Sequence, residues 1–155
     1  MKVLIHASLD MQYEMICARD YIEKNSKFEV VLPDLTRYQH IRDVEGDDIL
    51  FTRIKNRLTR DNLYRVEKCD ALLILNYTHR GVKNYIGGNS FLEMAVAFYL
   101  KKPIFLLNDI PQDMSYTEEI KSLYPTVVYN LENFILILNN SEKLYKDYKK
   151  RYCIE

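Results

Sequence analysis

The stretch ALLILNYTHRGVKNYIGGNSFLEMAVAFYLKKPIFLLN (residues 71–108) decides the fold of this chain. It begins and ends with short apolar runs, at 71–77 and 103–108, that do not alternate with polar residues. Such runs are typical of parallel strands that are covered on both faces. The segment from Asn89 or Ser90 to Leu100 reads as a helix, and either of its first two residues could cap it. We therefore predict a strand–loop–helix–strand unit with a right-handed connection.

The same alternation of apolar runs and helix-like segments extends along the chain in both directions. Further apolar runs lie at 2–7 and 28–33, with a weaker one at 125–130. Helix-like segments occupy 11–25, with Ser8 or Asp10 as a possible cap, then 48–68 and about 131–151. Buried strands that alternate with helices form a parallel sheet with helices on both faces. We predict one doubly wound, flavodoxin- or Rossmann-like α/β domain over residues 1–155, with about five mainly parallel strands.

Composition restricts the classes of partner. The 155 residues contain 22 acidic and 22 basic side chains, so the overall charge does not favour nucleic acid or a membrane surface. The three cysteines are widely spaced without a CxxC pair, which argues against disulfides and a zinc site. No apolar run approaches the roughly 20 residues of a membrane span, and none resembles a signal peptide. We expect a cytoplasmic protein with a small-molecule partner, and neither metal nor cofactor.

The loops that follow the strands are the places to look for a site. In doubly wound sheets, ligands bind beyond the carboxyl ends of the strands. Four polar loops fulfil this condition, at 6–10, 33–40, 76–90 and 108–114, and the third is the longest. From the first and third loops we predict these binding residues: His6, Ser8, Asp10, Asn76, Gly87, Gly88, Asn89 and Ser90.

The glycine pair in the third loop has two interpretations. Gly87 and Gly88 let the backbone approach a ligand, and the helix after them begins with free N–H groups that favour an anion. The alternative is an ordinary turn followed by a helix cap. The motif is neither a Walker A loop nor GxGxxG, so on its own it does not separate the two.

Glu93 is a carboxylate among apolar neighbours. Water solvates a carboxylate far better than a protein interior does, so such a position suggests a rim or a site. One interpretation is an acid in the first helical turn, stabilised by the helix dipole. The other is a nucleophile or general base that faces the crevice.

Two segments, DNLYRVEKCDALLILNY (61–77) and GGNSFLEMAVAFYLKKPIFLL (87–107), resemble the nucleoside 2-deoxyribosyltransferase superfamily, which includes nucleoside-monophosphate N-glycosidases. The resemblance implies hydrolysis or transfer at the N-glycosidic bond of a nucleoside or nucleoside monophosphate. It makes Glu93 the catalytic nucleophile, with 89–93 where the family has Gly-Thr-x-x-Glu. It also implies a substrate contact from Asn62 and a homo-oligomer.

The chain departs from the family pattern at three places. Gly87 stands roughly where transferases carry an acid. The second acid of the family falls on or beside Asp61-Asn62, where the alignment prefers the amide. Residues 6–10 lack the aromatic that orients the nucleophile. A noncatalytic nucleotide-binding or sensing module on the same fold is therefore the alternative function.

A departing base also needs a proton, for which His6, Asp10 and His79 are candidates. Each histidine could instead be structural or solvated.

Overall fold

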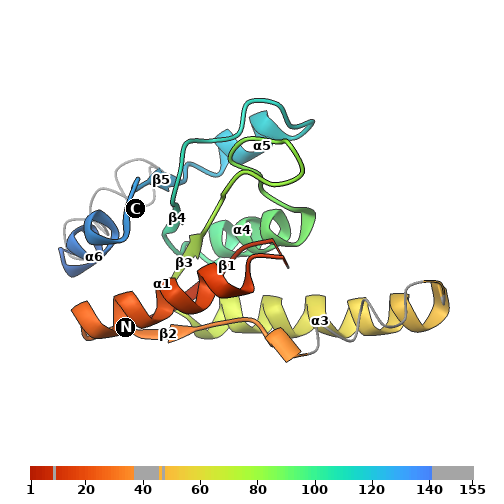
Figure 1. Ribbon diagram of the computed structural model, residues 1–155, viewed down its shortest axis with the longest axis horizontal. Helices are drawn as coiled ribbons and strands as arrows, with labels where there is room; N and C mark the ends of the chain where they lie inside the picture. The colour runs from red at the N-terminus through yellow and green to blue at the C-terminus, as the bar shows by residue number, and fades with distance from the viewer. Residues whose placement is uncertain (9, 37–45, 47, 141–155) are drawn as a thin grey trace.

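One five-stranded parallel sheet organises the protein. The computed structural model describes residues 1–8, 10–36, 46 and 48–140 (Figure 1). Within these residues, all paired strands run parallel in the order β2-β1-β3-β4-β5. This order confirms the predicted doubly wound α/β class. The strands are β1 (Lys2–His6), β2 (Glu29–Val31), β3 (Ala71–Ile74), β4 (Ile104–Leu106) and β5 (Thr126–Val127).

Helices cover both faces of the sheet. They are α1 (Gln12–Asn25), α3 (Asp48–Lys68), α4 (Gly88–Tyr99), α5 (Thr117–Ser122) and α6 (Leu131–Asn139). Successive residues of β1 point to opposite faces, as a pleated strand requires. Val3 and Ile5 join a core with α1 and α6, whereas Leu4 joins a second core with α3, α4 and α5. Two apolar layers therefore enclose the sheet, which explains its uninterrupted apolar runs.

The topology creates a crevice between β1 and β3. The two strands are neighbours, with Leu4 opposite Leu72 and His6 opposite Ile74. The chain leaves β1 for α1 on one face of the sheet and leaves β3 for α4 on the other. The loops above these two strand ends therefore diverge and leave space between them, as expected at the switch point of a doubly wound sheet.

Three predicted helix ends are corrected. Met11, not Ser8 or Asp10, is the N-cap of α1, because Ser8 closes a backbone turn in which its carbonyl accepts the Met11 N–H at 2.9 Å. Gly87 is the N-cap of α4, so Asn89 and Ser90 already lie within the helix instead of capping it. The last helix ends at Asn139. The predicted continuation from 141 to 151 lies outside the described residues.

A lysine side chain joins α3 to β4 at the edge of the sheet where the strands begin. Lys102 Nζ donates to the carbonyls of Val66 and Glu67, at 2.9 and 2.5 Å, and to that of Cys69. This contact satisfies carbonyl groups at the C-terminal end of α3 and ties that end to the start of β4.

None of the helices in the described part of the chain has the length and apolar character to cross a membrane.

Candidate functional site

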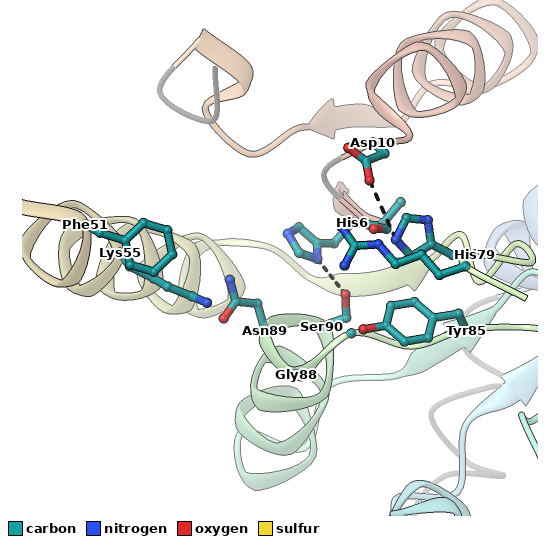
Figure 2. Close-up of a pocket in the computed structure, with 13 residues that line it drawn as sticks. His6, Asp10, Phe51, Lys55, His79, Tyr85, Gly88, Asn89 and Ser90 are labelled. Carbon is teal, nitrogen blue, oxygen red and sulfur yellow. Dashed lines mark hydrogen bonds and ion pairs between the residues drawn. The ribbon is translucent and has the colours of Figure 1, made fainter. Parts of the chain in front are cut away.

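A cavity of about 760 Å³ opens above the carboxyl ends of β1 and β3 (Figure 2). It is bounded by the loop after β1, by α3, and by the loop that joins β3 to α4. The lining residues are His6, Ala7, Ser8, Asp10, Phe51, Lys55, His79, Arg80, Tyr85, Gly87, Gly88, Asn89 and Ser90.

The structure brings seven of the predicted site residues together around this cavity. These are His6, Ser8, Asp10, Gly87, Gly88, Asn89 and Ser90. Three others do not line it. Glu93 is buried beside the cavity residue His6, and Asn62 is buried beside Glu93. Asn76 is buried at the end of β3.

The N-terminal end of α4 reaches the cavity without a side-chain cap. Gly87 is in extended conformation, and the first backbone bond of the helix runs from Phe91 N–H to the Gly87 carbonyl at 2.9 Å. The N–H groups at the start of a helix have no acceptor inside the helix. A Cβ added at Gly88 would meet no protein atom within 4 Å, so the space beside it belongs to the cavity. This end of α4 is suited to an anion.

Glu93 lies beneath the cavity, and its position corrects one of the two interpretations of this residue. The first turn of α4 contains no acidic residue, and Glu93 is 1% exposed. It is therefore not a helix-start acid in solvent. Neither carboxyl oxygen forms a hydrogen bond within the described residues, and Oε2 lies 3.3 Å from His6 Nδ1.

Burial controls the charge of this carboxyl. Desolvation raises the pKa of Glu93 to about 8, while the Asn62 amide and the Arg65 charge oppose that shift. The Asn62 amide favours the ionised carboxylate. Its own oxygen accepts a hydrogen bond from the Arg65 guanidinium at 3.0 Å. Glu93 is therefore mainly protonated at pH 7.

His6 connects the buried carboxyl to the floor of the cavity. Its Nδ1 lies 2.9 Å from Ser90 Oγ and 3.3 Å from Glu93 Oε2 (Figure 2 shows the contact with Ser90). Burial, followed by the charge of Arg65, lowers the pKa of His6 to about 4, so the ring is neutral at pH 7. A Ser-His-acid triad uses both ring nitrogens. Here one nitrogen faces both partners, so the three residues are not such a triad.

Asn76 has a structural position. Its Nδ2 donates to the carbonyls of Asn108 and Asp109, both at 3.0 Å, and its Oδ1 accepts from the Asn108 N–H at 2.8 Å. These bonds clamp the carboxyl ends of β3 and β4 together. The side chain is fully buried and is not part of the cavity wall.

Six wall residues were not among the predicted binding residues: Ala7, Phe51, Lys55, His79, Arg80 and Tyr85. Lys55 Nζ lies 5.5 Å from the centre of the Phe51 ring, one helical turn away on α3. Arg80 and Gly81 both have positive φ, 49° and 80°, in a tight turn closed by backbone bonds between His79 and Val82. Gly81 is a sequence signal for this turn. The α3 residues carry no such signal, because only the packing of α3 brings them to the cavity.

A second acid–histidine pair, Asp10 and His79, lies on the opposite side of the cavity from α3 (Figure 2). His79 Nε2 lies 3.6 Å from Asp10 Oδ2, which links the loop after β1 to the loop after β3. The Tyr85 ring lies beside His79, with ring centres 5.2 Å apart and planes inclined by 43°. The cavity thus has Lys55 and Phe51 at one end, an acid–histidine pair at the other, and the start of α4 between them.

This combination of groups suits an anionic ligand that carries a flat ring. The cation of Lys55 and the start of α4 favour a phosphate, and Phe51 and Tyr85 offer aromatic surfaces.

Searches of protein-family models, curated proteins and solved structures found no match to this chain.

Proposed function

We propose that this protein binds a nucleoside or nucleoside monophosphate and breaks its N-glycosidic bond by hydrolysis or transfer, with Glu93 as nucleophile. The observation that carries this proposal is the Glu93 carboxyl, which is buried and has no hydrogen bond within the described residues. An unsatisfied buried carboxyl lowers stability, and groups with strongly shifted pKa values cluster at functional sites. The resemblance to the deoxyribosyltransferase superfamily supports the same residue.

Glu93 matches the chemistry of glycosidic cleavage. Positive charge develops at the anomeric carbon as its bond to the base breaks. A carboxylate stabilises that charge and can then form a covalent glycosyl intermediate. Water or a second base resolves the intermediate, which gives the free sugar phosphate or an exchanged nucleotide.

The resting pair must rearrange before this step. Glu93 is protonated at pH 7, and the nearest basic atom is His6 Nδ1, 3.3 Å away. In our proposal the proton passes to His6 as positive charge develops on the sugar. Ser90 and His6 line the cavity above the carboxyl, so Glu93 must also change rotamer to reach the anomeric carbon.

The cavity favours a nucleotide over a nucleoside. Lys55 and the uncapped start of α4 line the same cavity, and Figure 2 shows Asn89 drawn between them. We place the phosphate there, the sugar above Ser90 and His6, and the base toward Tyr85 and His79. This orientation puts the anomeric carbon over the buried carboxyl.

A noncatalytic nucleotide-binding module is the second candidate. It is favoured by one observation: Glu93 is 1% exposed and does not line the cavity. In this case the start of α4 binds phosphate while the neutral His6–Glu93 pair only supports the floor.

Incubation with a panel of nucleosides and nucleoside monophosphates separates the two candidates. Free base, detected by chromatography, is the result expected for the enzyme. Thermal stabilisation by a nucleotide without any base release supports the binding module. Neither stabilisation nor base release would contradict both.

We further propose a cytoplasmic homo-oligomer, as the family resemblance implies. Leu92 and Tyr99 lie two turns apart on α4 and are exposed, so they offer apolar surface for a second copy. Analytical ultracentrifugation at micromolar concentration tests this, and a monomer would contradict it.

A further inference from the structure

The Asp10–His79 pair is a second titratable group that the proposed nucleophile does not use. Both residues line the cavity, at the end away from Lys55 (Figure 2). The pair joins two loops that lie 69 positions apart in the sequence, at residues 10 and 79. His79 is mostly buried, with 13% of its side chain exposed, whereas the Asp10 side chain is 35% exposed.

Several contacts hold the His79 ring in place. Its backbone closes a tight turn with Val82, with N–H to carbonyl distances of 3.0 and 2.9 Å in the two directions. The Tyr85 ring packs beside the imidazole, and the Asp10 carboxylate faces Nε2 at 3.6 Å. With the Asp10 carboxylate facing Nε2, Nδ1 is the ring nitrogen left to exchange a proton.

We propose that His79 is the general acid that protonates the departing base, with Asp10 as its positioning residue. This inference rests on the proposed function. The bond between the anomeric carbon and the base nitrogen breaks, and its electron pair stays on the base. The imidazolium of His79 gives its Nδ1 proton to the base while the Glu93 carboxylate forms a bond to the anomeric carbon.

The second half of the reaction restores His79. Water attacks the anomeric carbon, and the bond from that carbon to Glu93 breaks with its electron pair returned to the carboxylate. Neutral His79 takes a proton from the water, and the released Glu93 carboxylate takes back the proton that His6 held. The sum is nucleotide plus water giving sugar phosphate plus free base, without any other reactant. The two reacting groups approach from different sides: Glu93 from below the floor and His79 from the wall.

A leaving group that needs no proton isolates this role. The probe is 4-nitrophenyl β-D-ribofuranoside 5-phosphate, whose nitrophenolate departs unprotonated. For the nucleotide that the wild-type protein cleaves best, His79→Gln should lower the rate of base release by about a hundredfold or more. With the nitrophenyl probe, the loss should stay below about tenfold. Asp10→Asn should show the same pattern with a smaller loss.

Controls separate acid catalysis from structure. Lys83→Gln changes an exposed residue of the same loop that does not line the cavity, and should leave both rates unchanged. Thermal melting shows whether each variant folds. Equal losses on the two substrates, or no loss with His79→Gln, would overturn the role of His79 while the proposed function stands. If the wild-type protein binds nucleotides but releases no base, the proposed function and this inference both fail.

Discussion

Nδ1 of His6 lies 3.3 Å from Oε2 of Glu93, and both side chains are buried. Burial moves the two groups in opposite directions, raising the pKa of Glu93 to about 8 and lowering that of His6 to about 4. The pair is therefore neutral in the folded protein at pH 7, where an exposed glutamate would be charged. Burying the Glu93 carboxyl without a hydrogen bond in the described part of the chain costs stability.

The first prediction is that Glu93 makes stability fall as pH rises. The pKa of Glu93 is about 8 in the fold against an ordinary 4.5, so between these values the folded state binds one more proton than the unfolded state. Stability then decreases by roughly 1.4 kcal/mol per pH unit. His6 acts in the opposite sense between about 4 and 6.5, because its unfolded form binds the extra proton there.

Glu93→Gln isolates the acid's contribution, because glutamine is neutral at every pH. Urea unfolding of the variant and the wild type at pH 5.5, 6.5 and 7.5 gives the difference in unfolding free energy. We expect this difference to move in favour of the variant by roughly 1.4 kcal/mol for each unit. A difference independent of pH would mean that Glu93 is ionised in the fold.

The second prediction concerns Lys55 and the phosphate. If Lys55 contacts the phosphate, Lys55→Gln should weaken binding of a nucleoside monophosphate by about ten- to a hundredfold, the effect of losing one hydrogen bond to a charged group. Binding of the matching nucleoside, measured by calorimetry, should be unchanged. Arg57→Gln, an exposed change on the same helix, is the control. Equal weakening of nucleotide and nucleoside would contradict a phosphate contact.

The third prediction tests the structural position of Asn76. Asn76→Ala removes three part-buried hydrogen bonds by which a buried side chain joins the ends of β3 and β4. We expect a loss of about 2–4 kcal/mol in unfolding free energy, because three hydrogen bonds of about 0.5–1.5 kcal/mol each are lost. The exposed Asn25, whose side chain bonds only to the Tyr21 carbonyl in the described structure, gives a control variant, Asn25→Ala, with a loss under about 1 kcal/mol. A loss as small for Asn76→Ala would exclude the clamp.

The sequence predicted the sheet because its strands are buried on both faces. The runs at 2–7, 71–77 and 103–108 need no alternation, and both of their faces contribute to the two cores. The predicted ends of the strands and helices were less accurate than the predicted sheet. Gly87 caps α4 although Asn89 and Ser90 are the better caps by residue type, because the loop geometry fixes where the helix begins.

The candidate site was predictable only where loops supply it. Loop residues such as Ser8 and Gly88 reach the cavity because they follow strand ends. Phe51 and Lys55 lie within a helix, and their approach depends on how α3 packs against the sheet. Glu93 was singled out by its apolar neighbours, but the sequence could not show that His6 and Ser90 lie between it and the cavity.

The most direct test of the central claim compares base release and nucleotide binding in Glu93→Gln. Glutamine keeps the size of the side chain but cannot carry the charge that meets the developing positive charge on the sugar. We expect base release to fall at least a hundredfold, the effect of losing one major electrostatic contribution to the transition state, while nucleotide binding by calorimetry survives. Unchanged base release from a folded Glu93→Gln protein would contradict the account.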